Sequence, residues 1–133
     1  MTGSEFHDSV VTADKWSKVI ALFVAIGVFL VARELTGDVQ FGSIVAATAG
    51  IGTRLYIPHH VSVRLPESDR LSLQDHPVTG NYHHGAAGLA LVAASVVALG
   101  AFLLGHGFLT AVGIGVISGV VIHVVLASWL PTA

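Results

Sequence analysis

The longest apolar stretch of the chain covers residues 85–130, where 46 consecutive positions contain no Asp, Glu, Lys or Arg. A single helix of that length would measure roughly 69 Å, whereas the hydrocarbon core of a bilayer is about 30 Å thick. The stretch must therefore fold back on itself, and Gly105–Gly107 is the predicted turn. We expect two membrane-spanning helices, at about 85–104 and about 108–130, with Pro131 ending the second.

Two further spans are predicted before this stretch. The first, at about 16–32, has an unbroken apolar core from Val19 to Ala32, and a short turn at Thr36–Asp38 follows it. The second, at about 41–57, is less apolar and is expected to end at Pro58. A re-entrant or interfacial segment is the alternative to a full crossing for this span. Its polar residues are Ser43, Thr48, Thr53 and Arg54.

The predicted fold is an all-α, polytopic integral membrane protein, in which residues 1–133 form one membrane domain of four helices in a bundle. Residues 58–84 would form a loop on the same side as both termini. Basic residues support this topology, because five would lie on that side and Arg33 alone on the other. The five are Lys15, Lys18, Arg54, Arg64 and Arg70. We therefore predict a multi-pass protein of the cell (inner) membrane with cytoplasmic N- and C-termini.

Small residues recur at every fourth position of three spans, which favours close helix packing within lipid. One such row continues into Arg54 and another into His123, so both side chains are expected to face protein. A homo-oligomer or a subunit of a membrane complex is the predicted assembly. The rows are Gly42, Ala46, Gly50 and Arg54; Ala86, Ala90, Ala94 and Ala98; and Ala111, Gly115, Gly119, His123 and Ala127.

The loop at 58–84 contains alternating apolar and polar residues at 61–65 and 71–74, on either side of a turn that begins at Pro66. Period-2 alternation around such a turn predicts a short β-hairpin. In the matching register, His60 would lie opposite His76, with Cβ atoms about 5 Å apart.

Histidine is unusually frequent, with eight residues against six for Lys and Arg together. The four-span topology brings most of them to the cytoplasmic end. Neutral imidazoles bind transition metals, and a nearby carboxylate can complete or orient such a site. The spacing matches no compact metal motif. The candidate metal ligands are His59, His60, His76, His83, His84 and Asp75.

A second hypothesis is a b-type cytochrome anchor, in which His84 and His123 on different helices would clamp haem b. Four-helix membrane cytochromes and the membrane anchors of respiratory dehydrogenases have a similar general build. An ionisable residue inside a span, such as His123, is functional by default. The third hypothesis is a structural or accessory membrane protein without catalytic chemistry.

Composition narrows these choices. The net charge of −2 offers no basic patch for nucleic acid, so lipid and protein are the expected partners. The chain has no cysteine, which excludes disulfides and thiolate chemistry. No P-loop, dinucleotide-binding or Ser-His-Asp pattern is present, and the sequence leaves enzymatic activity undecided. The three functions remain open at this point.

Overall fold

The computed structural model describes residues 6–70, 73 and 82–132, and this part of the chain is entirely helical, with no strand. The four long helices and one short 3₁₀ helix are α1 (Asp8–Thr36), α2 (Val39–Val63), η1 (Glu67–Asp69), α3 (His84–Leu103) and α4 (Phe108–Trp129). The predicted count of four helices is confirmed. The two in the uncharged stretch agree with their predicted bounds to within one residue.

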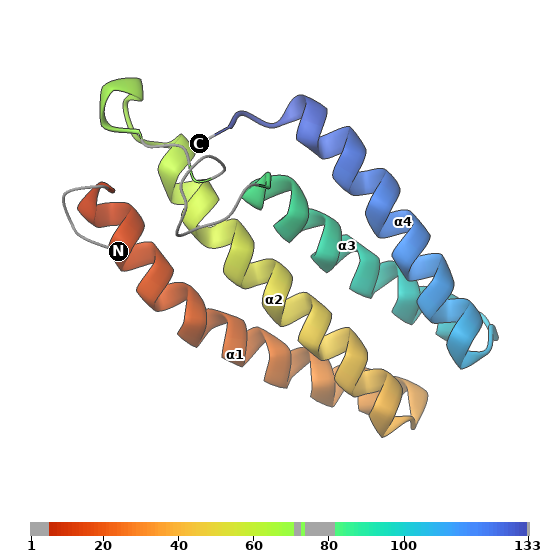
Figure 1. The fold of residues 1–133 in the computed structure, drawn as a ribbon. Helices are drawn as coiled ribbons and strands as arrows, with labels where there is room; N and C mark the ends of the chain where they lie inside the picture. Colours follow the sequence, from red (N-terminus) through yellow and green to blue (C-terminus); the bar gives the residue numbers. More distant parts are fainter. Residues whose placement is uncertain (1–5, 71–72, 74–81, 133) are drawn as a thin grey trace.

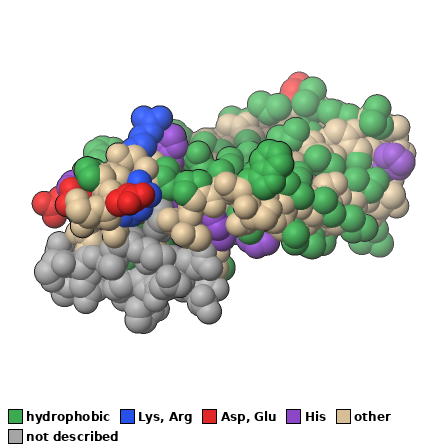
Figure 2. Space-filling model, turned by 90° about the horizontal axis from the view of Figure 1, so that it is seen from above, with side chains coloured by type: hydrophobic (Ala, Val, Ile, Leu, Met, Phe, Trp, Pro, Cys, Tyr) green, Lys and Arg blue, Asp and Glu red, His purple; other side chains and the backbone are tan. Residues whose placement is uncertain are grey.

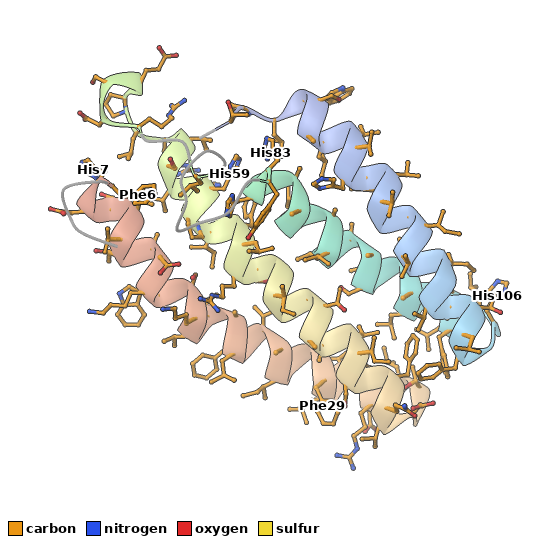
Figure 3. All side chains as sticks on the ribbon, in the orientation of Figure 1. Phe6, His7, Phe29, His59, His83 and His106 are labelled. Atoms are coloured by element: carbon orange, nitrogen blue, oxygen red, sulfur yellow. The ribbon has the colours of Figure 1, made fainter. Side chains whose placement is uncertain are left out.

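The helices lie in an antiparallel row, and each packs against the next one in the chain (Figure 1). α1 and α4 occupy the two edges of the row, so the arrangement is more open than the predicted bundle. The start of α1, the end of α2, the start of α3 and the end of α4 meet at one end. We call this the histidine end, because it holds His59 and His83 (Figure 3). The turns at Gly37 and Gly105 lie at the opposite end.

Both short turns are fixed by local chemistry. Gly37 adopts a left-handed conformation, with φ of 69°, and its N–H donates to the carbonyl of Arg33 over 2.8 Å. Asp38 then begins α2, because its carboxylate accepts from the N–H of Phe41 at 2.9 Å. Gly105, with φ of 99°, turns the chain from α3 into α4. The turn predicted at Gly105–Gly107 is therefore confirmed.

Small residues set the spacing between neighbouring helices. A Cβ on Gly50 of α2 would lie 3.1 Å from the Cβ of Ala25 on α1. A Cβ on Gly115 of α4 would lie 2.8 Å from the Cβ of Ala98 on α3. These contacts agree with the predicted role of the small-residue rows in packing.

Three helices are long and apolar enough to cross a membrane, namely α1, α3 and α4. Figure 2 shows hydrophobic side chains over much of one face, while most of the visible Lys, Arg, Asp and Glu side chains gather toward one end. On α4, exposed apolar residues follow one another along the helix, from Val116 to Trp129. Apolar side chains exposed along the long helix faces are consistent with a membrane protein.

α2 does not end where the sequence analysis expected. The helix continues through Pro58 to Val63, so residues 61–63 are helical. The prediction that these residues form the first strand of a β-hairpin is therefore wrong. Pro58 lacks an N–H and so leaves the carbonyl four residues earlier without its helical donor. At the end of the helix, Arg70 supplies donors to terminal carbonyls. Its guanidinium Nη2 donates to the carbonyls of Val63 and Leu65, both at 2.8 Å. Most of the predicted second strand, including His76, lies outside the described residues.

A small apolar cluster also holds the start of the chain. Phe6, Val10 and Leu73 are almost fully buried together and pack against Val61 and Leu65. The sequence analysis gave Phe6 no role. In the structure Phe6 anchors the segment before α1 to the end of α2, on the side where the loop leaves the helices.

Candidate functional site

Four histidines from two helices gather at the histidine end, and we call them the histidine cluster: His59 and His60 near the end of α2, and His83 and His84 at the start of α3. Figure 3 shows the labelled side chains of His59 and His83 close together. Their ring centroids are 5.2 Å apart. Three of the four are buried, and His60 is half-buried. The predicted convergence of these residues at one end is therefore confirmed.

His83 uses both of its ring nitrogens inside the fold. Nδ1 accepts a hydrogen bond from the N–H of Ala86 at 3.1 Å and so caps α3. Nε2 lies 3.2 Å from the carbonyl oxygen of Leu130, which directly follows α4. A carbonyl only accepts, so Nε2 must carry the proton and donate it. His83 is thus a neutral imidazole that joins the start of α3 to the end of α4.

His59 packs directly on the backbone of α3 at Gly85. A Cβ on Gly85 would overlap the imidazole, so the close approach requires glycine. His59 is 3% exposed. Burial, together with the charges that His83, His84 and His60 would carry when protonated, lowers the pKa of His59 to about 4. His59 is therefore uncharged at neutral pH.

Two tyrosines complete the surroundings of the cluster. The hydroxyl of Tyr56 lies 3.1 Å from Nδ1 of His60, one turn further along α2. The ring of Tyr82 stacks on that of His84, with centroids 4.1 Å apart. Every histidine of the cluster therefore has a ring contact or hydrogen bond within the protein.

The predicted metal site is not assembled by the described residues. Within residues 6–70, 73 and 82–132, no three His, Asp or Glu side chains are placed to share one ion. Two of the predicted ligands, Asp75 and His76, lie outside the described residues. His83 could bind a metal only after giving up one of its two hydrogen bonds.

Arg54 does not face protein as expected, because its side chain is exposed. The neighbouring contacts explain the difference. Gly50 faces Ala21 and Ala25 of α1, so Arg54, one turn further along the antiparallel α2, lies level with the turn that contains Lys18. Near the end of an apolar segment, a long cationic side chain can extend toward water.

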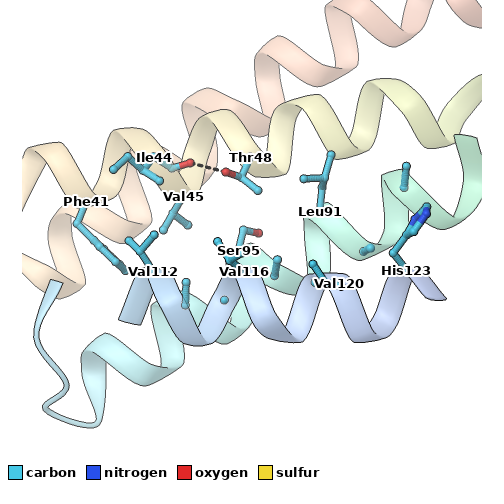
Figure 4. Close-up of a pocket in the computed structure, with 16 residues that line it drawn as sticks. Phe41, Ile44, Val45, Thr48, Leu91, Ser95, Val112, Val116, Val120 and His123 are labelled. Atoms are coloured by element: carbon cyan, nitrogen blue, oxygen red, sulfur yellow. Dashed lines mark hydrogen bonds between the residues drawn. The ribbon is translucent and has the colours of Figure 1, made fainter. Parts of the chain in front are cut away.

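His123 lies in a different place, a groove of about 500 Å³ between α2 and α4 with α3 as its floor (Figure 4). Its ring is half-buried and has no hydrogen-bond partner among the described residues. Ser95 also lines the groove, and its hydroxyl donates to the carbonyl of Val92 at 2.6 Å. His123 is the one histidine among the residues that line the groove, so the haem pair His84–His123 stays a prediction.

Sequence reasoning missed three contributors to the histidine end. Gly85 follows His83 and His84 directly, and its position beside two histidines was an available signal. The carbonyl of Leu130 is a backbone group and leaves no signal in the sequence. Arg70 was counted as a loop charge, whereas it caps the end of α2.

The histidine cluster and the groove are thus the two candidate functional sites in the described part of the chain. The cluster is internally bonded, and the groove is apolar with one imidazole. Comparison of the chain with protein families, with curated proteins and with solved structures finds no match.

Proposed function

We propose that the protein is a four-span integral membrane protein that serves as a structural or accessory subunit, with both termini on the cytoplasmic side. α2 would be the fourth span. It packs along both α1 and α3, and these two helices are themselves long and apolar enough to cross. At 25 residues α2 measures about 38 Å, which exceeds the thickness of the hydrocarbon core.

The polar residues of α2 are compatible with a crossing. Ser43, Thr48 and Thr53 each donate their hydroxyl to the carbonyl four residues earlier, at 2.8 Å in all three cases. Each hydroxyl is therefore satisfied by its own helix and needs no water.

The charges support the proposed orientation. Lys18 and Arg54 lie at one level on neighbouring helices, and Arg33 lies near the opposite turn. An excess of basic residues on the side of the histidine end makes that side cytoplasmic.

The single observation that carries the structural role is the double hydrogen bonding of His83. This residue joins two helices that form a hairpin, and it leaves no ring nitrogen for a substrate. The other members of the cluster also bond or pack within the protein. The cluster is therefore best explained as a set of contacts that holds the helix ends together in a membrane subunit.

Single-cysteine variants test the topology, because the chain has no native cysteine. In intact spheroplasts, a membrane-impermeant maleimide should label Arg33→Cys but not Arg64→Cys, and both should react after permeabilisation. Labelling of both in intact cells would contradict four spans.

A second experiment tests the accessory role. The tagged chain should migrate in a larger complex on native gels of mildly solubilised membranes. Migration as an isolated chain would contradict that role.

A transition-metal site is the second candidate, and one observation favours it. His59 is neutral at neutral pH and lies beside three other imidazoles, as metal binding by histidine requires. Asp75 and His76 would have to complete the site. Elemental analysis of protein purified without chelator should then find about one metal ion per chain, lost in His59→Gln. The absorption spectrum of the same sample tests the haem alternative through a Soret band.

A further inference from the structure

The groove beside His123 has the form of a ligand site. It runs along α4 from Val112 to His123, about 16 Å, and reaches Phe41 of α2 at the end opposite His123 (Figure 4). Its volume of about 500 Å³ falls in the usual range for small-molecule sites, roughly 300–1,000 Å³. An apolar groove with few polar groups is also the usual composition of such a site.

Hydrogen-bonding capacity in the groove is concentrated at one point. Thr48 and Ser95 line the groove, but their hydroxyls are bonded to the carbonyls of Ile44 and Val92. The hydroxyl donors are thus occupied, and His123 is the remaining lining side chain with a hydrogen-bond donor to offer. A ligand in this groove would therefore be apolar along most of its length and polar at one end.

The polar end of the groove lies at the level expected for a membrane interface. Gly119 faces Ala90 and Ala94, so His123, one turn further, lies level with residues 86–90 of α3. Gly52 faces Gly88 in the same region, which places Arg54 at nearly the same level. A ligand head at His123 would thus lie near the headgroups, and its tail would extend toward the middle of the bilayer.

The charge of the lining residues indicates which kind of amphiphile the groove could bind. None of the residues that line the groove is Lys, Arg, Asp or Glu. A phospholipid phosphate or a fatty-acid carboxylate at His123 would have no Lys or Arg side chain within the groove to neutralise it. The head should therefore be uncharged and should accept a hydrogen bond. On α3, the lining residues at the level of His123 include Ala87 and Ala90, whose side chains are small.

We propose that this groove binds an isoprenoid quinone, with a ring carbonyl accepting a hydrogen bond from the imidazole of His123 and the apolar tail lying along the groove. The inference concerns binding alone and is independent of the structural role of the histidine cluster. Under this proposal the subunit has a binding function as well as a structural one, because it holds a lipid-soluble quinone.

Fluorescence quenching of Trp129 by decylubiquinone provides the test, since this tryptophan lies about 9 Å further along α4 than His123. Full-length Trp16→Phe protein in nanodiscs leaves Trp129 as the one reporter. Quenching should saturate with quinone. His123→Phe should raise the apparent Kd about tenfold, as expected for loss of a hydrogen bond in a dry site. His123→Gln retains a donor and should restore part of the affinity.

Matched variants separate the groove from general effects. His106→Phe changes an exposed histidine at the far turn and should leave the Kd unchanged. Ala87→Leu narrows the groove and should weaken binding, whereas Ala93→Leu on the same helix, outside the lining, should not. Together these variants keep the test informative even if His123→Phe fails to fold.

Three results would overturn the proposal. The first is quenching that does not saturate or is equal in His123→Phe and the parent protein. The second is equal displacement of the quinone by dodecanol, which would assign the groove to ordinary lipid chains. The third is a stable dimer that Ala87→Leu dissociates, which would assign the groove to a second copy of this chain.

Discussion

The imidazole of His83 bridges two helices, since its Nε2 lies 3.2 Å from the carbonyl oxygen of Leu130 while its Nδ1 caps α3. Residues 83 and 130 enclose the whole hairpin of α3 and α4. One side chain therefore fastens the open end of this hairpin, opposite its turn at Gly105.

Substitution of His83 should reveal two separable contributions. His83→Ala removes both hydrogen bonds and should lower the free energy of unfolding by about 2 kcal/mol, roughly 1 from the cap and 1 from the bond to Leu130. His83→Asn retains a good cap but does not reach Leu130, so it should lose about half as much. Unfolding by SDS titration in mixed micelles measures both, with His106→Ala as the control. Equal losses in the Ala and Asn variants would contradict the two-bond assignment.

Gly85 and His59 should show strong coupling. In Gly85→Ala the new methyl group would occupy the position of the His59 ring, so the ring or α3 must move, at a cost of about 1–3 kcal/mol. His59→Ala removes the obstructing ring. The double variant should therefore be more stable than the sum of the two single losses predicts, by about 1 kcal/mol or more. Additive losses in this cycle would show that the ring does not pack on Gly85.

Several features of this fold follow from local signals, and others do not. The uncharged stretch and its central glycines located α3 and α4 to within one residue, because hydropathy and turn chemistry act locally. The end of α2 was missed because the helix continues through Pro58 to Val63, whereas the prediction ended it at the proline. The exposure of Arg54 was not predicted. A row at every fourth position indicates the face of the helix on which a residue lies, but not how close that residue is to the end of the apolar segment.

The histidine end shows the same division. The predicted topology alone was sufficient to place His59 and His83 at the same end of the molecule. Their roles depend on distant partners, namely the backbone of Gly85 and the carbonyl of Leu130. Backbone groups are the same at every position, so no pattern of side chains could identify these contacts in advance.

Stability should depend on pH through His59. Its folded pKa of about 4 lies below the ordinary value of 6.5, so the unfolded chain binds this proton at a higher pH than the folded chain does. The contribution is fully present above about pH 6.5 and is lost as the pH falls to about 4. The total loss across this window should be about 3 kcal/mol.

Unfolding measured at intervals from pH 7.5 to pH 4 checks this dependence. His59→Gln has no titrating ring and should flatten the profile, whereas His106→Gln should retain the slope of the parent protein. A parent profile that matches His59→Gln throughout the window would refute the burial of a neutral imidazole at this position.

The contact between α2 and α3 yields the sharpest comparison of matched variants. A Cβ on Gly88 would lie 2.7 Å from both the carbonyl oxygen of Gly52 and the backbone nitrogen of Tyr56. Backbone atoms cannot rotate away, so Gly88→Ala must separate the two helices and should lower the free energy of unfolding by about 2 kcal/mol or more. Gly100, on the same helix, has no atom within 4 Å of its Cβ position. Gly100→Ala should therefore gain about 0.5–1 kcal/mol from helix propensity. The two variants make the same chemical change on one helix, and SDS titration of both should give opposite signs if α2 and α3 touch backbone to backbone at Gly88.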